Sequence, residues 1–137
     1  MHKKFLVAAS ILGGIAVVLG AFGAHKLKEL VPPETLNAFD TGVRYQMYHA
    51  LVLLAVAILY ERIPGKWLRW AGTTFIIGII LFSGSLYTLT SLKATGQVGL
   101  SGLGILTPIG GLFFVLGWVF LIVAVSSYKH TAKSSTL

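Results

Sequence analysis

Two histidines, His25 and His49, are the residues of this sequence best suited to bind a metal or a haem. Imidazole is a common axial ligand of haem iron, so two histidines at one depth on neighbouring helices could hold a haem between them. Metal-bound histidines are usually oriented by a second polar group, and no carboxylate lies near His49 inside its apolar segment. We therefore predict no metal and no other cofactor, with a haem- or quinone-binding redox subunit as an open alternative.

A guanidinium and several hydroxyl groups could instead bind an anion. Arg44 favours a carboxylate or phosphate partner, and Asp40, one helical turn earlier, is a local candidate. The candidate polar cluster comprises His25, Arg44, Tyr45, Gln46, Tyr48, His49, Ser83, Ser85, Tyr87 and Thr107. Two interpretations stay open. Either these groups hydrogen-bond one another and connect the helices, or they form a shallow outward-facing site for a lipid headgroup, a small anion or a partner helix.

Residues for other catalytic chemistry are scarce. The sequence has no cysteine, and its four acidic residues lie near the ends of apolar segments: Glu29, Glu34, Asp40 and Glu61. It contains no Ser-His-Asp set, no HExxH motif and no phosphate-binding loop. We therefore expect a protein that is not an enzyme.

Four apolar segments must position these side chains. Phe5–Ala24 is a run of twenty uncharged residues, which is the length a helix needs to cross a bilayer core of about 30 Å. Only 11% of all residues are charged, against about 25% in soluble domains. The sequence predicts an all-α fold, a four-helix transmembrane bundle. Residues 1–137 would form a single integral membrane domain, with spans at about 5–25, 42–60, 69–90 and 104–127.

Basic residues lie singly or in pairs at the ends of these segments. If the N-terminus is cytoplasmic, seven Lys and Arg residues fall on the cytoplasmic side and four outside. The positive-inside rule then favours both termini in the cytoplasm, and we predict a multi-pass protein of the bacterial inner membrane. The net charge of +7 does not indicate nucleic-acid binding, because no Lys- or Arg-rich face could follow a phosphate backbone.

The second segment has an unusual beginning. Its purely apolar part, Ala50–Tyr60, is too short to span a bilayer, so the helix must include residues back to about Gly42. From Pro33 onward, apolar residues recur at three- and four-residue steps and predict one helical face: Leu36, Phe39, Val43, Met47, Ala50 and Leu54. We expect an amphipathic interfacial start to this helix, a possible bend at Gly42, and the residues from Arg44 to His49 at or just below the outer interface.

The fourth helix has two possible starts. Either Thr107 caps a helix that begins at Pro108, or the helix begins near Leu103 and bends at Pro108. Small residues at four-residue steps let helices approach closely. The predicted packing residues are Gly13, Ala16, Gly20, Gly23, Ala24, Gly84, Gly110 and Gly111. Because alternate helices run in opposite directions, the candidate polar cluster should lie in the outer third of the bundle.

Several ordered motifs resemble one family. They are GAFGAH at residues 20–25, TGVRYQMYHAL at 41–51, FSGSLY at 82–87, and TPIGG at 107–111 followed by Gly117-Trp118. Together they resemble the domain-of-unknown-function 423 family of small bacterial inner-membrane proteins, to which animal transmembrane protein 256 looks similar. The resemblance runs from about residue 4 to about residue 126. It implies a small multi-helix membrane protein and no particular activity.

From these observations we expect a non-enzymatic membrane protein that acts through helix packing, as an accessory subunit of a larger complex or as a membrane-organising protein. Its partners would be the lipid bilayer, other membrane subunits or a second copy of itself, and a bound phospholipid is possible. One alternative is a small transporter or a lipid- or anion-binding protein that uses the polar cluster. Four helices leave no room for a pore, so transport would require an oligomer.

Overall fold

Every regular element is a helix in residues 1–97 and 101–128, which the computed structural model describes. The elements are α1 (Lys3–His25), η1 (Leu27–Glu29), α2 (Pro33–Leu59), α3 (Lys66–Gly78), η2 (Ile79–Ser83), α4 (Gly84–Ala94), η3 (Ser101–Ile105) and α5 (Leu106–Ser126). Four helical stretches are long and apolar enough to cross a membrane, at Lys3–Glu29, Pro33–Leu59, Lys66–Ala94 and Gly102–Ser126. The predicted all-α, four-helix fold is confirmed.

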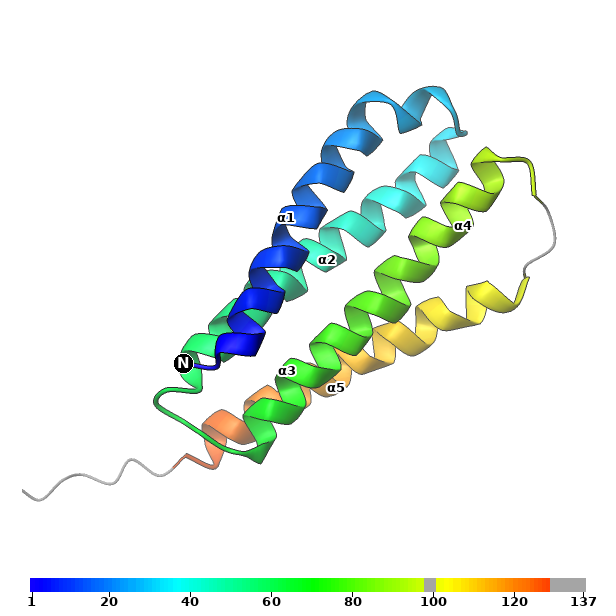
Figure 1. Cartoon of the computed structure of the whole chain (residues 1–137). Helices are drawn as coiled ribbons and strands as arrows, with labels where there is room; N and C mark the ends of the chain where they lie inside the picture. Colours follow the sequence, from blue (N-terminus) through cyan, green and yellow to red (C-terminus); the bar gives the residue numbers. More distant parts are fainter. Residues whose placement is uncertain (98–100, 129–137) are drawn as a thin grey trace, which may run out of the picture.

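The helices pack in a simple order (Figure 1). α1 packs mainly along α2, and α5 mainly along α3, while α2 also packs against the continuous helix formed by α3, η2 and α4. The Met1 ammonium lies 3.7 Å from the Glu61 carboxylate, and the His2 backbone N–H donates to the Ala57 carbonyl at 2.9 Å. These contacts place the N-terminus beside the turn between α2 and α3. We call this the N-terminal end of the bundle.

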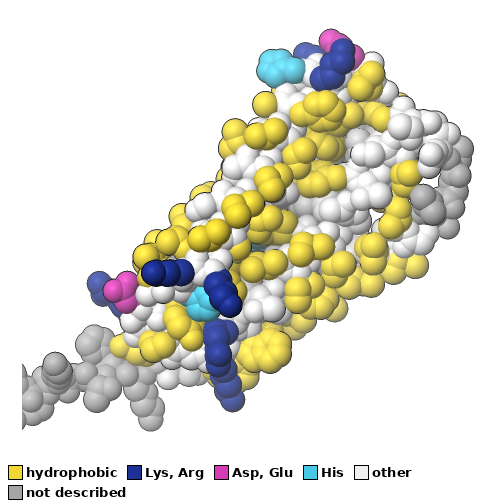
Figure 2. All heavy atoms as spheres, viewed as in Figure 1, with side chains coloured by type: hydrophobic (Ala, Val, Ile, Leu, Met, Phe, Trp, Pro, Cys, Tyr) yellow, Lys and Arg dark blue, Asp and Glu magenta, His cyan; other side chains and the backbone are white. Residues whose placement is uncertain are grey.

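The centre of the bundle is apolar and tightly closed. Leu53, Val56, Leu68 and Phe75 are fully buried where α2 meets α3. The outer faces are also apolar: Val18 is 69% exposed and Ile122 is 63% exposed. In Figure 2 hydrophobic side chains cover most of the length of the bundle, and Lys and Arg gather at its two ends. Lipid tails solvate such a surface, so these exposed side chains carry no solvation penalty in a bilayer.

Small residues on α1 bring α2 close. Ala16 is 1% exposed, and a methyl group placed on Gly20 would lie 3.4 Å from Val43 Cγ1. A methyl group on Gly23 would lie 3.0 Å from the Phe39 ring, so this ring would have to shift by a few tenths of an ångström to admit it. Two of the predicted packing residues lie elsewhere: Ala24 is exposed, and Gly84 has no neighbour in reach of an added methyl group.

α5 begins at neither of the two predicted starts. The α-helix begins at Leu106, after the short 3₁₀ helix Ser101–Ile105. Thr107 is therefore inside the helix and is not its cap. Pro108 falls in the first turn, where a backbone N–H has no partner in its own helix, so the missing N–H of proline costs nothing there.

The buried face of α2 is also rotated from the predicted one. α2 is one helix from Pro33 to Leu59, and Gly42 lies in its interior against Leu86 and Tyr87. Its buried residues are Thr35, Phe39, Gly42, Gln46, His49, Ala50, Leu53, Val56 and Ala57. Polar residues thus replace Val43 and Met47 at the centre of the face. The predicted apolar face is right at Phe39 and Ala50 but not at Val43 and Met47, because Gln46 and His49 have partners between the helices.

Candidate functional site

Gln46 is the centre of a polar network between three helices. Its side chain is 3% exposed. Its amide Nε2 donates to the Leu12 backbone carbonyl on α1 at 2.8 Å, and its Oε1 accepts from the Tyr87 hydroxyl on α4 at 2.8 Å. One side chain on α2 therefore joins the helices on both sides of it, and both polar atoms of the amide are used in contacts with the protein.

Ser83 makes a second link to α2 from the π-helical segment Ile79–Ser83. It is fully buried, and its hydroxyl donates to the Gly42 carbonyl at 2.7 Å. A π-helical turn is wider than an α-helical one and interrupts the regular backbone hydrogen bonds. The turn brings the Ser83 hydroxyl to the Gly42 carbonyl, and the missing side chain of Gly42 leaves room for Leu86 and Tyr87 beside it. π-Segments are frequent at functional sites, but this one faces a protein contact.

Ser85 links α4 to the beginning of α5. Its Oγ lies 2.9 Å from the Phe82 carbonyl and 2.6 Å from the Thr107 hydroxyl. Because a carbonyl oxygen only accepts, Ser85 donates to Phe82 and Thr107 donates to Ser85. This contact connects the opposite end of the bundle, at which Leu106 begins α5, to the α3–α4 helix.

His49 lies in an aromatic enclosure between α2, α3 and α5. It is 5% exposed, and its ring stacks on Phe114 with centroids 3.5 Å apart and planes 4° apart. Phe75 and Trp118 pack at its other sides, with centroids 5.6 and 6.4 Å away. His49 Nδ1 lies 2.7 Å from the Tyr45 carbonyl. Nδ1 must therefore carry the proton of this bond, because the carbonyl only accepts.

His25 and His49 are not brought together. Contacts of Gly13 with Ala50 and of Gly20 with Val43 show that His49 lies level with about residue 14 of α1. His25 lies about eleven residues further along that helix, roughly 16 Å at about 1.5 Å per residue. It is exposed, whereas His49 is buried near the middle of the bundle. One haem held by this pair is therefore excluded by the geometry, and the expected common depth does not hold for them.

Three further residues of the candidate polar cluster lie on the outside. Arg44 is exposed, and its Nε donates to the Asp40 backbone carbonyl at 3.4 Å. Within the described part of the chain it forms no ion pair with the Asp40 carboxylate. Tyr45 and Tyr48 are 41% and 56% exposed, and the Tyr45 ring stacks on Phe82 at 4.8 Å. The cluster is thus divided into an interior network and separate surface residues.

Close contacts between glycine and phenylalanine hold α5 against the α3–α4 helix. A methyl group on Gly110 would lie 2.7 Å from the Cα of Phe82 and closer still to its backbone nitrogen. A methyl group on Gly78 would lie 2.5 Å from Phe114 Cδ1, and one on Gly117 would lie 2.5 Å from Phe75 Cε1. Gly110 is among the predicted packing residues, whereas Gly78 and Gly117 are not. Their phenylalanine partners lie on another helix, and no spacing in a single sequence reveals such a pair.

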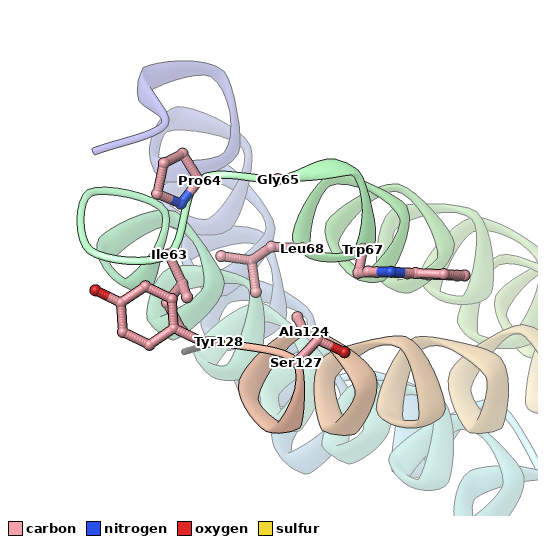
Figure 3. Close-up of a pocket in the computed structure, with 8 residues that line it drawn as sticks. All are labelled: Ile63, Pro64, Gly65, Trp67, Leu68, Ala124, Ser127 and Tyr128. Carbon is pink, nitrogen blue, oxygen red and sulfur yellow. The ribbon is translucent and has the colours of Figure 1, made fainter. Parts of the chain in front are cut away.

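Small hollows at the surface are lined by residues other than Gln46, Ser83 and Tyr87. One of about 180 Å³ lies at the N-terminal end, between the α2–α3 turn and the end of α5. Figure 3 shows Ile63 and Leu68 directed toward this end of α5, near Ala124. Sites for small organic ligands usually measure about 300–1,000 Å³, so this hollow is too small for one. Among the described residues, no group of three His, Cys, Asp or Glu side chains could hold a metal ion.

We expect the bond between Gln46 and Tyr87 to be measurable as an energetic coupling. Gln46→Leu should lower the free energy of unfolding by about 1–3 kcal/mol, because it leaves the Tyr87 hydroxyl without its acceptor. Tyr87→Phe should cost less in that background than in the wild type. A double-mutant cycle in detergent micelles should give a coupling of about 0.6 kcal/mol, and at most about 1.7 kcal/mol. Strictly additive effects would contradict the bond.

These features define the class of protein: a multi-pass, all-helical membrane protein whose interior polar groups join its helices. Residues 19–111 match a family described as a protein of unknown function (DUF423). The chain is 42% identical over 127 residues to the UPF0382 membrane protein YwdK of Bacillus subtilis, covering 92% of this chain and 98% of the relative. It is 36% identical over 137 residues to the UPF0382 inner membrane protein YgdD of Escherichia coli K12, covering 98% of each chain.

The chain belongs to the DUF423 family, and it is a multi-pass inner-membrane protein. A UPF0382 membrane protein of Haemophilus influenzae is also similar, with 40% identity over 94% of this chain and 97% of the relative. No solved structure shows significant similarity to the chain. The location of both termini on the cytoplasmic side stays a prediction.

Proposed function

We propose that this protein is a non-enzymatic membrane protein that acts through helix packing, as an accessory subunit of a larger complex or as a membrane-organising protein. One observation carries the proposal. Among the described residues, no buried side-chain nitrogen or oxygen lacks a hydrogen-bond partner. Gln46 and Ser83 bond to neighbouring helices, whereas His49 and Thr74 bond within their own helix. The interior polar groups are thus occupied by contacts inside the protein, which leaves the outer faces as the surfaces available to partners.

The outer face of α1 is the best candidate for contact with another protein. α1 packs mainly on α2, and much of its remaining surface is exposed, including Val7 and Val18 at 58% and 69%. A shallow groove of about 240 Å³ between α1 and α2 is lined partly by small residues, among them Ser10 and Gly14. A methyl group on Gly14 would have no neighbour within 4 Å. Small residues at a helix surface let a partner helix approach closely.

Site-specific crosslinking in native membranes tests this proposal. Because the chain has no cysteine, a single cysteine can carry a thiol-reactive photocrosslinker without competing sites. We expect Ser10→Cys to give one discrete product of higher mass. Its mass and peptide sequences distinguish a second copy of the chain from another subunit.

The matched control is Thr88→Cys, an exposed position on α4 away from the groove. It should give no discrete protein product. If both positions gave only lipid adducts, or the same unresolved mixture, contact through the α1 face would be ruled out.

The redox alternative loses its support because His25 and His49 lie apart. Binding of an anionic lipid is favoured by a different feature, at the N-terminal end of the bundle.

A further inference from the structure

A basic hollow lies at the N-terminal end, away from the candidate polar cluster. It measures about 350 Å³ and is lined by Lys66, Arg69, Trp70 and Thr73, all on α3. Residues three and four apart on a helix share one face, so these four side chains form a continuous strip. The strip begins with two cations and continues with an aromatic ring and a hydroxyl group.

The two cations have no acidic partner. Within residues 1–97 and 101–128, neither Lys66 nor Arg69 forms an ion pair or a side-chain hydrogen bond. Glu61 is the nearest acidic residue in the sequence, and it lies 3.7 Å from the Met1 ammonium. The other three acidic residues of the chain, Glu29, Glu34 and Asp40, precede the apolar part of α2 and lie toward the opposite end. Positive charge at the hollow is therefore not neutralised by an acidic side chain of the described residues.

The hydroxyl group of Thr73 is also available. Most serine and threonine hydroxyls in these helices donate to a backbone carbonyl of the preceding turn, as Thr74 does to Trp70 at 2.9 Å. Thr73 is exposed and forms no such bond within the described part of the chain. Thr73 lies four residues, about one helical turn, beyond Arg69. Its hydroxyl group can therefore donate to an oxygen atom one turn further from the end of the bundle than a phosphate bound by Arg69.

Aromatic side chains flank the strip on the side of α5. The rings of Trp67 and Trp70 lie 5.9 and 6.3 Å from that of Phe120, and Trp70 is 55% exposed. Tryptophan is enriched at the depth of lipid headgroups, where one edge of the ring is wet and its face is apolar.

Lys3 and Lys4 lie at the start of the neighbouring α1, where Phe5 packs on Gly72 of α3. Figure 2 shows Lys and Arg side chains gathered over this end.

We propose that this hollow binds one anionic phospholipid from the adjacent leaflet. Lys66 and Arg69 hold the phosphate, Thr73 donates to a glycerol or ester oxygen, and the acyl chains lie along the apolar surface beside Trp70. The order of groups along the strip matches the order in a phospholipid: a charged headgroup, then a polar backbone, then hydrocarbon. Lys and Arg residues at the end of a transmembrane helix attract acidic headgroups by this chemistry. The inference does not depend on the proposed function.

Native mass spectrometry of the full chain in mild detergent tests the proposal with phosphatidylglycerol, phosphatidylethanolamine and inorganic phosphate as probes. We expect one bound phosphatidylglycerol and markedly weaker binding of phosphatidylethanolamine. The double variant Lys66→Gln with Arg69→Gln should lose affinity for phosphatidylglycerol by roughly tenfold or more. Thr73→Val should lose a few-fold, roughly the effect of one hydrogen bond. All three substituted residues are exposed, so the bundle should stay folded in both variants.

Two charge-matched controls separate a defined site from diffuse attraction. Lys26→Gln with Lys28→Gln removes two charges at the opposite end, and Lys3→Gln with Lys4→Gln removes two at the same end. Both should keep most of the affinity. Equal loss in the Lys3/Lys4 and Lys66/Arg69 variants would show a general surface attraction and overturn the site. Equal binding of the two lipids, or competition by inorganic phosphate at concentrations similar to the lipid, would overturn the assignment to an anionic phospholipid.

Discussion

Gly110→Ala should destabilise the bundle strongly, by at least the ~1–3 kcal/mol typical of an overpacked core. The added methyl group would lie 2.7 Å from the Cα of Phe82 and closer still to its nitrogen. Because the obstacle is backbone, no side-chain rotation relieves it, and α5 must move away from the π-helical segment. That movement would also weaken the contact between Ser85 and Thr107. Thermal unfolding in mild detergent, followed by circular dichroism, measures the effect.

Gly111→Ala is the control for this prediction. A methyl group on Gly111 would lie 3.9 Å from the Phe82 ring, which is an ordinary contact. The same substitution in the same helix turn should therefore be neutral, or slightly stabilising because alanine has the higher helix propensity. Equal midpoints for Gly110→Ala and Gly111→Ala would show that α5 does not cross the α3–α4 helix at Gly110.

Phe114→Ala should also destabilise the protein, by about 3 kcal/mol. Phe114 is 4% exposed, fills the space above Gly78 and stacks on His49 at 3.5 Å. Truncation of a buried phenylalanine in protein cores costs about 3–5 kcal/mol. We expect the lower end of that range, because an unfolded transmembrane helix keeps its side chains in apolar lipid. Equilibrium unfolding of the purified protein in micelles measures the change.

Phe22→Ala is the matched control, because it removes the same side chain from α1, where Phe22 is 43% exposed. It should change the free energy of unfolding by less than about 1 kcal/mol. A second variant, Phe114→Leu, keeps most of the volume and should cost less than Phe114→Ala. If Phe22→Ala were as damaging as Phe114→Ala, the aromatic enclosure around His49 would not be a main source of stability.

The sequence by itself determined the number of helices and the membrane environment. Three uncharged segments of about twenty residues, and a fourth interrupted only by Arg44 near its start, leave no other fold for a chain of 137 residues, because a lipid-exposed backbone must satisfy its hydrogen bonds within each helix. The small residues on α1 were also visible, since Gly13, Ala16 and Gly20 recur at helical steps and need no knowledge of a partner. The polar residues were visible as a group, although their arrangement was not.

The tertiary structure decided which polar residues share a site. The distances of His25 and His49 from the ends of their apolar segments predicted a common depth for the two residues. The actual register of α1 on α2 is set by contacts such as Gly20 with Val43, and it separates the two histidines. The rotation of α2 about its own axis directs Gln46 and His49 inward, where each bonds to a backbone carbonyl. Helix rotation depends on the partners available on neighbouring helices, which apolar periodicity does not encode.

The contacts of α5 show the same division between sequence and structure. Glycines at 78, 110 and 117 are plain in the sequence, but each matters because a particular phenylalanine, or its backbone, on another helix lies against it. In a membrane, both the packed and the separated helices have apolar surroundings, so burial alone does not choose between rotations. Shape and hydrogen bonding between specific residues make that choice, and these exist only once the helices are packed.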